Sequence, residues 1–110
     1  MQQKTTTPHR VCFVLALKPG VGQEYMRRHQ QVWPEMQQML RQAGVYNYSL
    51  WVQGSQVIGY YQTKNLQRTT AAKAASAVQD KWNKYMADIL ETDAEGRPVL
   101  QNPQQVFMLE

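Results

Sequence analysis

The stretch Arg10-Val11-Cys12-Phe13-Val14-Leu15-Ala16-Leu17 is apolar on both sides of an extended chain. One side carries Val11, Phe13, Leu15 and Leu17, and the other carries Cys12, Val14 and Ala16. A strand that meets water on one face alternates apolar and polar residues, whereas a strand covered on both faces does not. The stretch therefore predicts a central strand in a sheet with both faces buried.

A helical region is predicted after the break at Pro19-Gly20. Between residues 21 and 43, large residues recur at steps of three and four, which is typical of a helix with one face on a core. These residues are Tyr25, His29, Val32, Trp33, Met36, Leu40 and Ala43. Pro34 removes a backbone donor, so we expect a kink or a break into two helices near Val32. Gly44 is suited to end the region.

The second half of the chain predicts a hairpin, a helical region and a strand. Residues 45–52 and 56–62 are rich in Tyr, Val, Ile and Trp and are separated by Gly54-Ser55, which indicates an antiparallel hairpin. Residues 66–90 are first alanine-rich and then periodic, which predicts a second helical region in one or two pieces. After a turn-rich segment, we expect residues 106–109 to form the last strand.

The predicted order of elements is β, α, β, β, α, β, which indicates an α+β fold of the ferredoxin-like type. Both helical regions then pack on one face of a four-stranded antiparallel sheet. The other face also needs a cover, because the first strand is apolar on both sides, and no further helix of this chain is available. We therefore expect two copies to pair through their sheets as a homodimer.

The length of 110 residues fits one compact domain. Residues 1–9 are polar and threonine-rich, so we expect a disordered tail there and a single domain at residues 10–110. No stretch has the length of a membrane span or the apolar core of a secretory signal, which predicts a cytoplasmic protein that does not bind membranes. The net charge is +4, but the basic residues are scattered among acids, so we do not expect nucleic-acid binding.

The residues that common metal and phosphate sites need are missing. The chain has one cysteine, Cys12, and two histidines, His9 and His29, which make no recognisable zinc or iron ligand set. The six glycines are dispersed, so no glycine-rich phosphate loop is present. The sequence therefore favours neither a metal centre nor a nucleotide site.

His29 is the candidate for acid/base chemistry. It lies within the stripe of the first helical region, one turn after Tyr25 and one turn before Trp33, so its side chain should point at the sheet. An unperturbed pKa of about 6.5 allows an imidazole to donate and accept protons near neutral pH. The alternative is a half-buried histidine whose ring is satisfied by a backbone carbonyl or a neighbouring tyrosine.

Aromatic side chains with polar tips are frequent in the hairpin and in the second helical region. They are Tyr46, Tyr48, Trp51, Tyr60, Tyr61, Trp82 and Tyr85. Such side chains suit a sugar, because the ring contacts C–H groups and the hydroxyl or indole N–H forms a hydrogen bond. The alternative is that most of them belong to the core.

Several short motifs along the chain are typical of one known enzyme family. They are Glu24-Tyr25-Met26-Arg27-Arg28-His29, Trp33-Pro34-Glu35, Gly44 with Asn47-Tyr48, Lys84-Tyr85-Met86-Ala87-Asp88-Ile89 and Val106-Phe107-Met108-Leu109. With these motifs the chain resembles the L-rhamnose mutarotases from about residue 10 to its end. The resemblance implies a dimeric ferredoxin-like α/β barrel that interconverts the anomers of a free monosaccharide, a deoxy-hexose, without metal or cofactor. It also implies that His29 is the catalytic proton donor and that Tyr25, Tyr48 and Trp82 contact the sugar.

The residue after Trp82 departs from the family pattern. The family usually has two adjacent tryptophans here, and this chain has Asn83, which we take as a further candidate sugar contact. L-fucose or a related deoxy-sugar is therefore an alternative to L-rhamnose. Two other functions also fit the fold: a non-catalytic sugar-binding or regulatory module, and a cofactor-free or haem-using oxygenase with His29 as the haem ligand.

Mutarotation requires little catalytic machinery. The ring oxygen must gain a proton and the anomeric hydroxyl must lose one, and the reaction already proceeds slowly in water. One general acid/base with a positioned partner is therefore sufficient, because each contributes a rate acceleration of about 100-fold or more. We expect His29 to protonate the ring oxygen, Tyr25 and Tyr48 to orient hydroxyl groups, and Trp82 to pack on the apolar face of the sugar.

Overall fold

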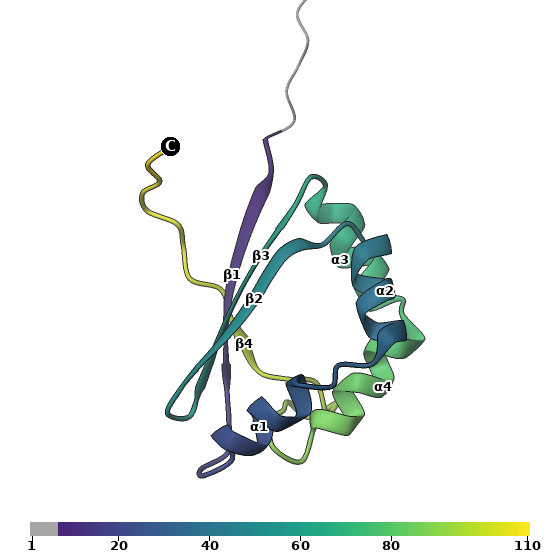
Figure 1. Cartoon of the computed structure of the whole chain (residues 1–110), viewed down its shortest axis with the longest axis vertical. Coiled ribbons are helices and arrows are strands. Elements are labelled where there is room, and N and C mark those ends of the chain that lie inside the picture. Colours follow the sequence, from purple (N-terminus) through teal and green to yellow (C-terminus); the bar gives the residue numbers. More distant parts are fainter. Residues whose placement is uncertain (1–6) are drawn as a thin grey trace, which may run out of the picture.

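The computed structural model describes residues 7–110 and has an α+β fold (Figure 1). Its elements are β1 (His9–Ala16), α1 (Gly22–His29), α2 (Pro34–Gln42), β2 (Tyr46–Gln53), β3 (Gln56–Thr63), α3 (Leu66–Ala74), α4 (Ala77–Met86) and β4 (Leu100–Gln101). The antiparallel sheet has the order β2-β3-β1-β4, so β1 lies inside it, as predicted. The predicted tail falls mostly on residues 1–6, outside the described residues, and His9 begins β1.

All four helices lie on one face of the sheet, as Figure 1 shows. The core lies between the two layers and contains Phe13, Leu15, Leu17, Tyr25, Met36, Val45, Val57, Tyr61, Trp82, Met86, Ile89 and Leu90. The opposite side of β1, with Cys12 and Val14, is only half-buried. Within residues 7–110 no helix covers that face, and no helix combines the length and the hydropathy that crossing a membrane requires.

The first helical region is broken where the sequence predicted. α1 ends at His29 and α2 begins at Pro34, in the first turn of a helix, where the missing N–H removes no hydrogen bond. Gly44 ends α2 with a φ of +93°, and the next amide, that of Val45, donates to the carbonyl of Leu40 at 2.9 Å. This arrangement closes the helix and directs the chain into β2.

The hairpin and the division of the second helical region also agree with the sequence. β2 and β3 pair around Gly54, which has a φ of +59°. The side chain of Asn65 caps α3 by accepting from the amide of Arg68, and that of Ser76 caps α4 by accepting from the amide of Gln79. The first cap therefore starts α3 before the alanine-rich residues 71–77, and the second starts α4 at their end.

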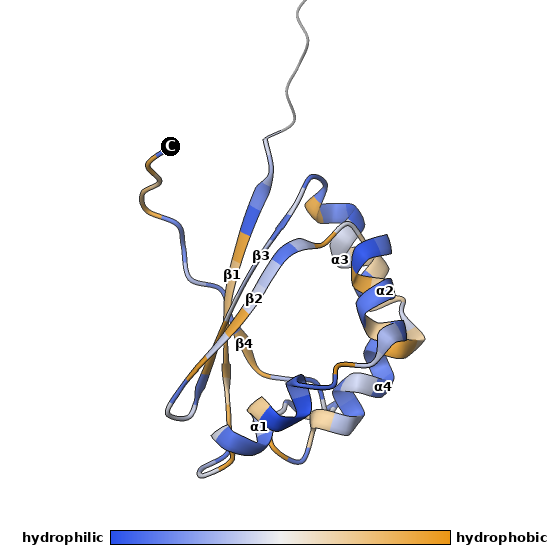
Figure 2. Cartoon of the chain, viewed as in Figure 1, coloured by the Kyte–Doolittle hydropathy of each residue, from blue (hydrophilic) through white to orange (hydrophobic). Residues whose placement is uncertain are grey.

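The predicted strand at residues 106–109 is wrong. The last strand is β4, at Leu100–Gln101, and residues 106–109 have no regular structure. The edge of β1 is already occupied where β4 pairs with Val14 and Leu15, and the side chain of Asn102 donates to the carbonyl of Cys12. Pro103 then has no N–H to continue the pairing. The apolar segment therefore leaves the sheet, and Figure 2 shows its hydrophobic residues away from the body of the protein.

Gly59 in β3 offers a stability prediction. It lies opposite Phe13, and a β-carbon at Gly59 would overlap the Phe13 ring. We expect Gly59→Ala to lower the free energy of unfolding by about 1–3 kcal/mol, because the ring has to move within a packed core. Urea denaturation of Gly59→Ala and Gly22→Ala measures the difference. A β-carbon at Gly22 makes only ordinary contacts at 3.5 Å or more, so an equal loss in both variants would contradict the explanation.

Candidate active site

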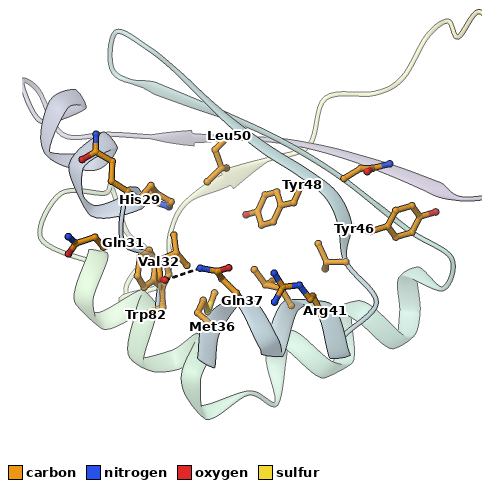
Figure 3. A pocket seen from close by; sticks show the side chains of 14 residues that line it. His29, Gln31, Val32, Met36, Gln37, Arg41, Tyr46, Tyr48, Leu50 and Trp82 are labelled. Atoms are coloured by element: carbon orange, nitrogen blue, oxygen red, sulfur yellow. Dashed lines mark hydrogen bonds between the residues drawn. The ribbon is translucent and has the colours of Figure 1, made fainter. Parts of the chain in front are cut away.

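Two adjoining cavities, of about 770 and 650 Å³, lie between the sheet and the helices. Both are in the size range of small-molecule sites. All five predicted site residues line the larger cavity: Tyr25, His29, Tyr48, Trp82 and Asn83. Three of them, His29, Tyr48 and Trp82, also line the smaller cavity, which Figure 3 shows from close by. The structure thus brings together residues from α1, β2 and α4.

His29 occupies the last position of α1, and its ring points into the cavity (Figure 3). Its Nδ1 lies 3.0 Å from the carbonyl oxygen of Tyr25, which can only accept, so Nδ1 carries the hydrogen. The ring stacks on Tyr25, with centroids 4.2 Å apart, and meets the edge of Trp82 at 5.3 Å. Burial lowers the pKa of His29, and the hydrogen bond to the Tyr25 carbonyl opposes this only in part. The neutral ring therefore presents Nε2 as an acceptor.

Two tyrosines supply hydroxyl groups to the same cavity. Tyr25 is 3% exposed, whereas Tyr48 is 37% exposed because its ring extends from β2 into the open space of the cavity (Figure 3). Desolvation of the phenol raises the pKa of both side chains, for Tyr48 because the ring lies within the cavity even though the residue as a whole is 37% exposed. The pKa of each is raised further by a neighbouring tyrosine, Tyr48 for Tyr25 and Tyr61 for Tyr48. Both hydroxyls therefore stay protonated near neutral pH and can donate hydrogen bonds.

Trp82 and Asn83 bring α4 into the cavity lining. Trp82 is 8% exposed and meets Trp33 edge-on, with ring centroids 5.0 Å apart. The Oδ1 atom of Asn83 accepts from Nε2 of Gln79, one turn earlier, at 3.0 Å. At position 83 the cavity lining therefore carries an amide rather than a second indole, and the neighbouring Trp33 lines neither cavity.

Arg28 connects the helix that carries His29 to the end of α4. Its guanidinium donates to Asp88 Oδ1 at 2.9 Å, to the Tyr85 carbonyl at 2.9 Å and to Glu24 Oε2 at 2.7 Å, and it lies over the Tyr85 ring. The pKa of Glu24 is lowered to about 2 by its hydrogen bonds to Arg27 and Arg28. This network holds α1 against α4, and it fixes His29 relative to Trp82.

Several other cavity residues were not among the five predicted site residues. Met36 and Leu40 line both cavities, and Tyr61 and Lys73 line the larger one. The two apolar residues were expected in a core, and Tyr61 was one of several aromatic side chains that suited either a sugar or the core, so the pattern did not distinguish a cavity wall. Lys73 lies in an alanine-rich helix with no periodic signal. Within residues 7–110 no group of three or more His, Cys, Asp or Glu side chains could hold a metal ion.

Comparison with known proteins agrees with the geometry. Residues 10–109 match the family model described as L-rhamnose mutarotase. This chain belongs to the L-rhamnose mutarotase family. A member from Phocaeicola vulgatus is 34% identical over 102 residues, which cover 92% of this chain and 98% of that protein. Another member, from Shigella flexneri serotype 5b, is 31% identical over 102 residues, which cover 91% of this chain and 97% of that protein.

Solved structures extend the comparison to three dimensions. The crystal structure of an L-rhamnose mutarotase from Formosa agariphila has a TM-score of 0.83 and 29% identity, covering 93% of this chain and 99% of that one. A putative antibiotic biosynthesis monooxygenase from Nitrosomonas europaea has a TM-score of 0.59 and 15% identity, covering 93% of this chain and 95% of that one. The second likeness shows the fold alone. The family and the first structure therefore favour a mutarotase over an oxygenase.

Proposed function

We propose that this protein is an isomerase that interconverts the α and β anomers of L-rhamnose, with His29 as the acid/base group. The observation that carries the proposal is the state of the His29 ring. One nitrogen donates to the Tyr25 carbonyl, the pKa is lowered by burial, and the ring points into a cavity lined by tyrosine and tryptophan. Membership of the mutarotase family supports this assignment.

A single imidazole nitrogen can serve both oxygens of the anomeric carbon, because the hydroxyl oxygen and the ring oxygen are attached to that one atom. Neutral Nε2 takes the proton of the anomeric hydroxyl, and the resulting imidazolium gives a proton to the ring oxygen as its bond to the anomeric carbon breaks. The open aldehyde rotates about its bond to the next carbon, and the ring closes on the opposite face. Every proton removed is returned, so no other reactant is consumed.

The other cavity residues hold the sugar in this proposal. The hydroxyls of Tyr25 and Tyr48 donate hydrogen bonds to sugar oxygens, and the indole of Trp82 packs on the apolar face of the ring. The amide of Asn83 hydrogen-bonds to a sugar hydroxyl where the family usually has an aromatic wall. Arg28 acts indirectly, since it holds α1 and α4 together.

Saturation-transfer NMR between the α and β anomers tests the function on L-rhamnose, L-fucose, D-glucose and D-galactose. We expect the protein to accelerate exchange most for L-rhamnose. A larger acceleration for L-fucose would make L-fucose the preferred sugar and would leave the proposed reaction unchanged. Binding of a sugar without any change of its exchange rate would contradict catalysis and favour a non-catalytic binding module.

The pH dependence of the rate separates a neutral His29 from a protonated one. Because burial lowers its pKa below 6.5, we expect the protein-dependent rate to be constant above pH 6.5. The rate should fall as the pH drops through the lowered pKa, because protonation removes the acceptor at Nε2. Exchange measured from acidic to neutral pH, with the rate in buffer alone subtracted, gives the profile. A rate that rises on acidification would contradict the assignment.

We also propose that the chain forms a homodimer and that two ferredoxin-like sheets make a dimeric α/β barrel. Two unpaired surfaces support this. The face of the sheet away from the helices carries Trp51, which is 65% exposed, and the half-buried Val14 and Ile58. The C-terminal segment carries Val106 and Phe107, which are 90% and 76% exposed. Apolar surface of this kind is usually covered by another protein surface.

Sedimentation equilibrium tests the dimer. We expect a mass of two chains of 12.8 kDa each. We expect Phe107→Asp to weaken dimerisation about tenfold or more, because a charge replaces an aromatic ring that the proposed dimer buries. Gln105→Asp adds the same charge at an exposed polar position two residues away and should leave the dimer intact. A wild-type chain that stays monomeric would contradict the proposal.

A further inference from the structure

Lys73 in α3 is a cation inside the larger cavity. Its Nζ lies 5.0 Å from the centroid of the Tyr61 ring. Tyr61 is 5% exposed and belongs to the core between the sheet and the helices, so the ammonium group lies over the inner face of the sheet. Both residues line the cavity that contains His29. Lys73 and His29 therefore line one cavity.

The charge of Lys73 has no carboxylate partner among residues 7–110. The ion pairs of this part of the chain are formed by Arg27, Arg28, Lys84 and Arg97. Asp80 lines the cavity, but its carboxylate pairs with Lys84 at 3.2 Å. Residues 1–6 contain no Asp or Glu. Burial lowers the pKa of Lys73, and the Tyr61 ring face compensates the buried charge only in part.

A row of aromatic rings leads from His29 to Lys73. His29 stacks on Tyr25, Tyr25 and Tyr48 line the same cavity, and the rings of Tyr48 and Tyr61 are 5.5 Å apart. Lys73 lies beyond Tyr61. For a sugar with its anomeric carbon at His29, an orientation along this row directs a substituent remote from that carbon toward the ammonium group.

We propose that Lys73 makes this cavity a site for acidic monosaccharides, in which the carboxylate of a hexuronate pairs with Lys73 while its anomeric carbon lies at His29. The inference rests on the proposed function and adds a substrate class to it. Ring opening of a hexuronate uses the same two oxygens at the anomeric carbon, so the carboxylate takes no part in the bond changes. It supplies an anion for this half-buried cation, which has no carboxylate partner among residues 7–110.

The cavity also accommodates the polar rim of such a sugar. Thr70, Ser76, Gln79 and Asn83 line it together with Lys73. Asn83 replaces an aromatic wall with an amide, which contacts a hydrated, hydroxyl-rich substrate better than a second indole does. Volume is not limiting, because the cavity of about 770 Å³ has room for a ring with a planar carboxylate.

Anomer exchange of matched acidic and neutral sugars tests the inference. D-galacturonate is compared with D-galactose, and D-glucuronate with D-glucose, with L-rhamnose as the reference for the proposed function. We expect the wild-type protein to accelerate at least one uronate about tenfold more than its neutral counterpart. In Lys73→Met the ratio of uronate to L-rhamnose acceleration should fall about tenfold or more, because the paired charge is removed.

Lys81→Met is the matched control, since Lys81 is an exposed residue of α4 outside the cavity lining. It removes the same charge and should leave every ratio unchanged. If Lys81→Met lowers the uronate ratio as much as Lys73→Met does, the effect is one of net charge, and the inference fails. If no uronate is accelerated more than its neutral counterpart while L-rhamnose is accelerated, only the inference fails. If no sugar at all is accelerated, the proposed function fails.

A second readout does not depend on activity. Pairing with a carboxylate stabilises the charged form of Lys73, so saturating uronate should raise the pKa of that amine, followed by NMR of ¹⁵N-labelled lysine. L-rhamnose carries no charge and should change it less. An equal response to both sugars would overturn the assignment of Lys73 as the anion partner.

Discussion

The His29→Ala variant is expected to lose the protein-dependent acceleration of L-rhamnose anomer exchange by about 100-fold or more. The substitution removes the Nε2 acceptor and leaves the tyrosines and Trp82 in place to bind the sugar. His29 is at the end of α1, where alanine is compatible with the helix, so the fold should be retained. Saturation-transfer NMR measures the rate, and circular dichroism checks the fold.

His9→Ala is the matched control, because it removes the only other histidine of the chain from the exposed start of β1. Its exchange rate should equal that of the wild-type protein. A folded His29→Ala variant that exchanges the anomers at the wild-type rate would remove this imidazole from the reaction. The cavity would then need another acid/base group, and the tyrosines would be the first to examine.

The Trp82→Ala variant is expected to lose about 3–5 kcal/mol of the free energy of unfolding. Trp82 is 8% exposed and its ring contacts those of His29, Trp33 and Tyr85. Truncation leaves a space between α1, α2 and α4 that these rings cannot fill without moving. Urea denaturation measures the loss. Trp82→Phe keeps an aromatic ring and should lose clearly less, so equal losses in the two variants would contradict this packing.

Local sequence rules predicted most of the fold because each element carries its own signal. The doubly apolar segment at residues 10–17 became the inner strand β1, and Pro34 divided the first helical region. Gly44 adopted the positive φ that a helix end requires. Tyr25 and His29 came to line one cavity because their helical spacing puts them on the same face of α1, and Tyr48, Trp82 and Asn83 join them from β2 and α4.

Other features could not be predicted because they depend on contacts between distant segments. Residues 106–109 have the composition of a strand, but the position beside β1 is occupied by Leu100–Gln101. Lys73 sits on a helix without a periodic pattern, and only the tertiary structure places its amine over Tyr61. The tautomer of His29 likewise follows from its distance to the Tyr25 carbonyl. The cytoplasmic location and the lack of nucleic-acid binding stay predictions.

The central claim is that Nε2 of a neutral His29 meets the sugar, and ¹⁵N NMR of the imidazole tests it most directly. In the free protein above pH 6.5, the account predicts a protonated Nδ1 and an unprotonated Nε2. Saturating L-rhamnose should shift the Nε2 resonance, as the nitrogen accepts a hydrogen bond, and leave Nδ1 nearly unchanged, with His9 as the internal reference. An Nε2 resonance that does not respond to L-rhamnose, or the opposite tautomer, would contradict it.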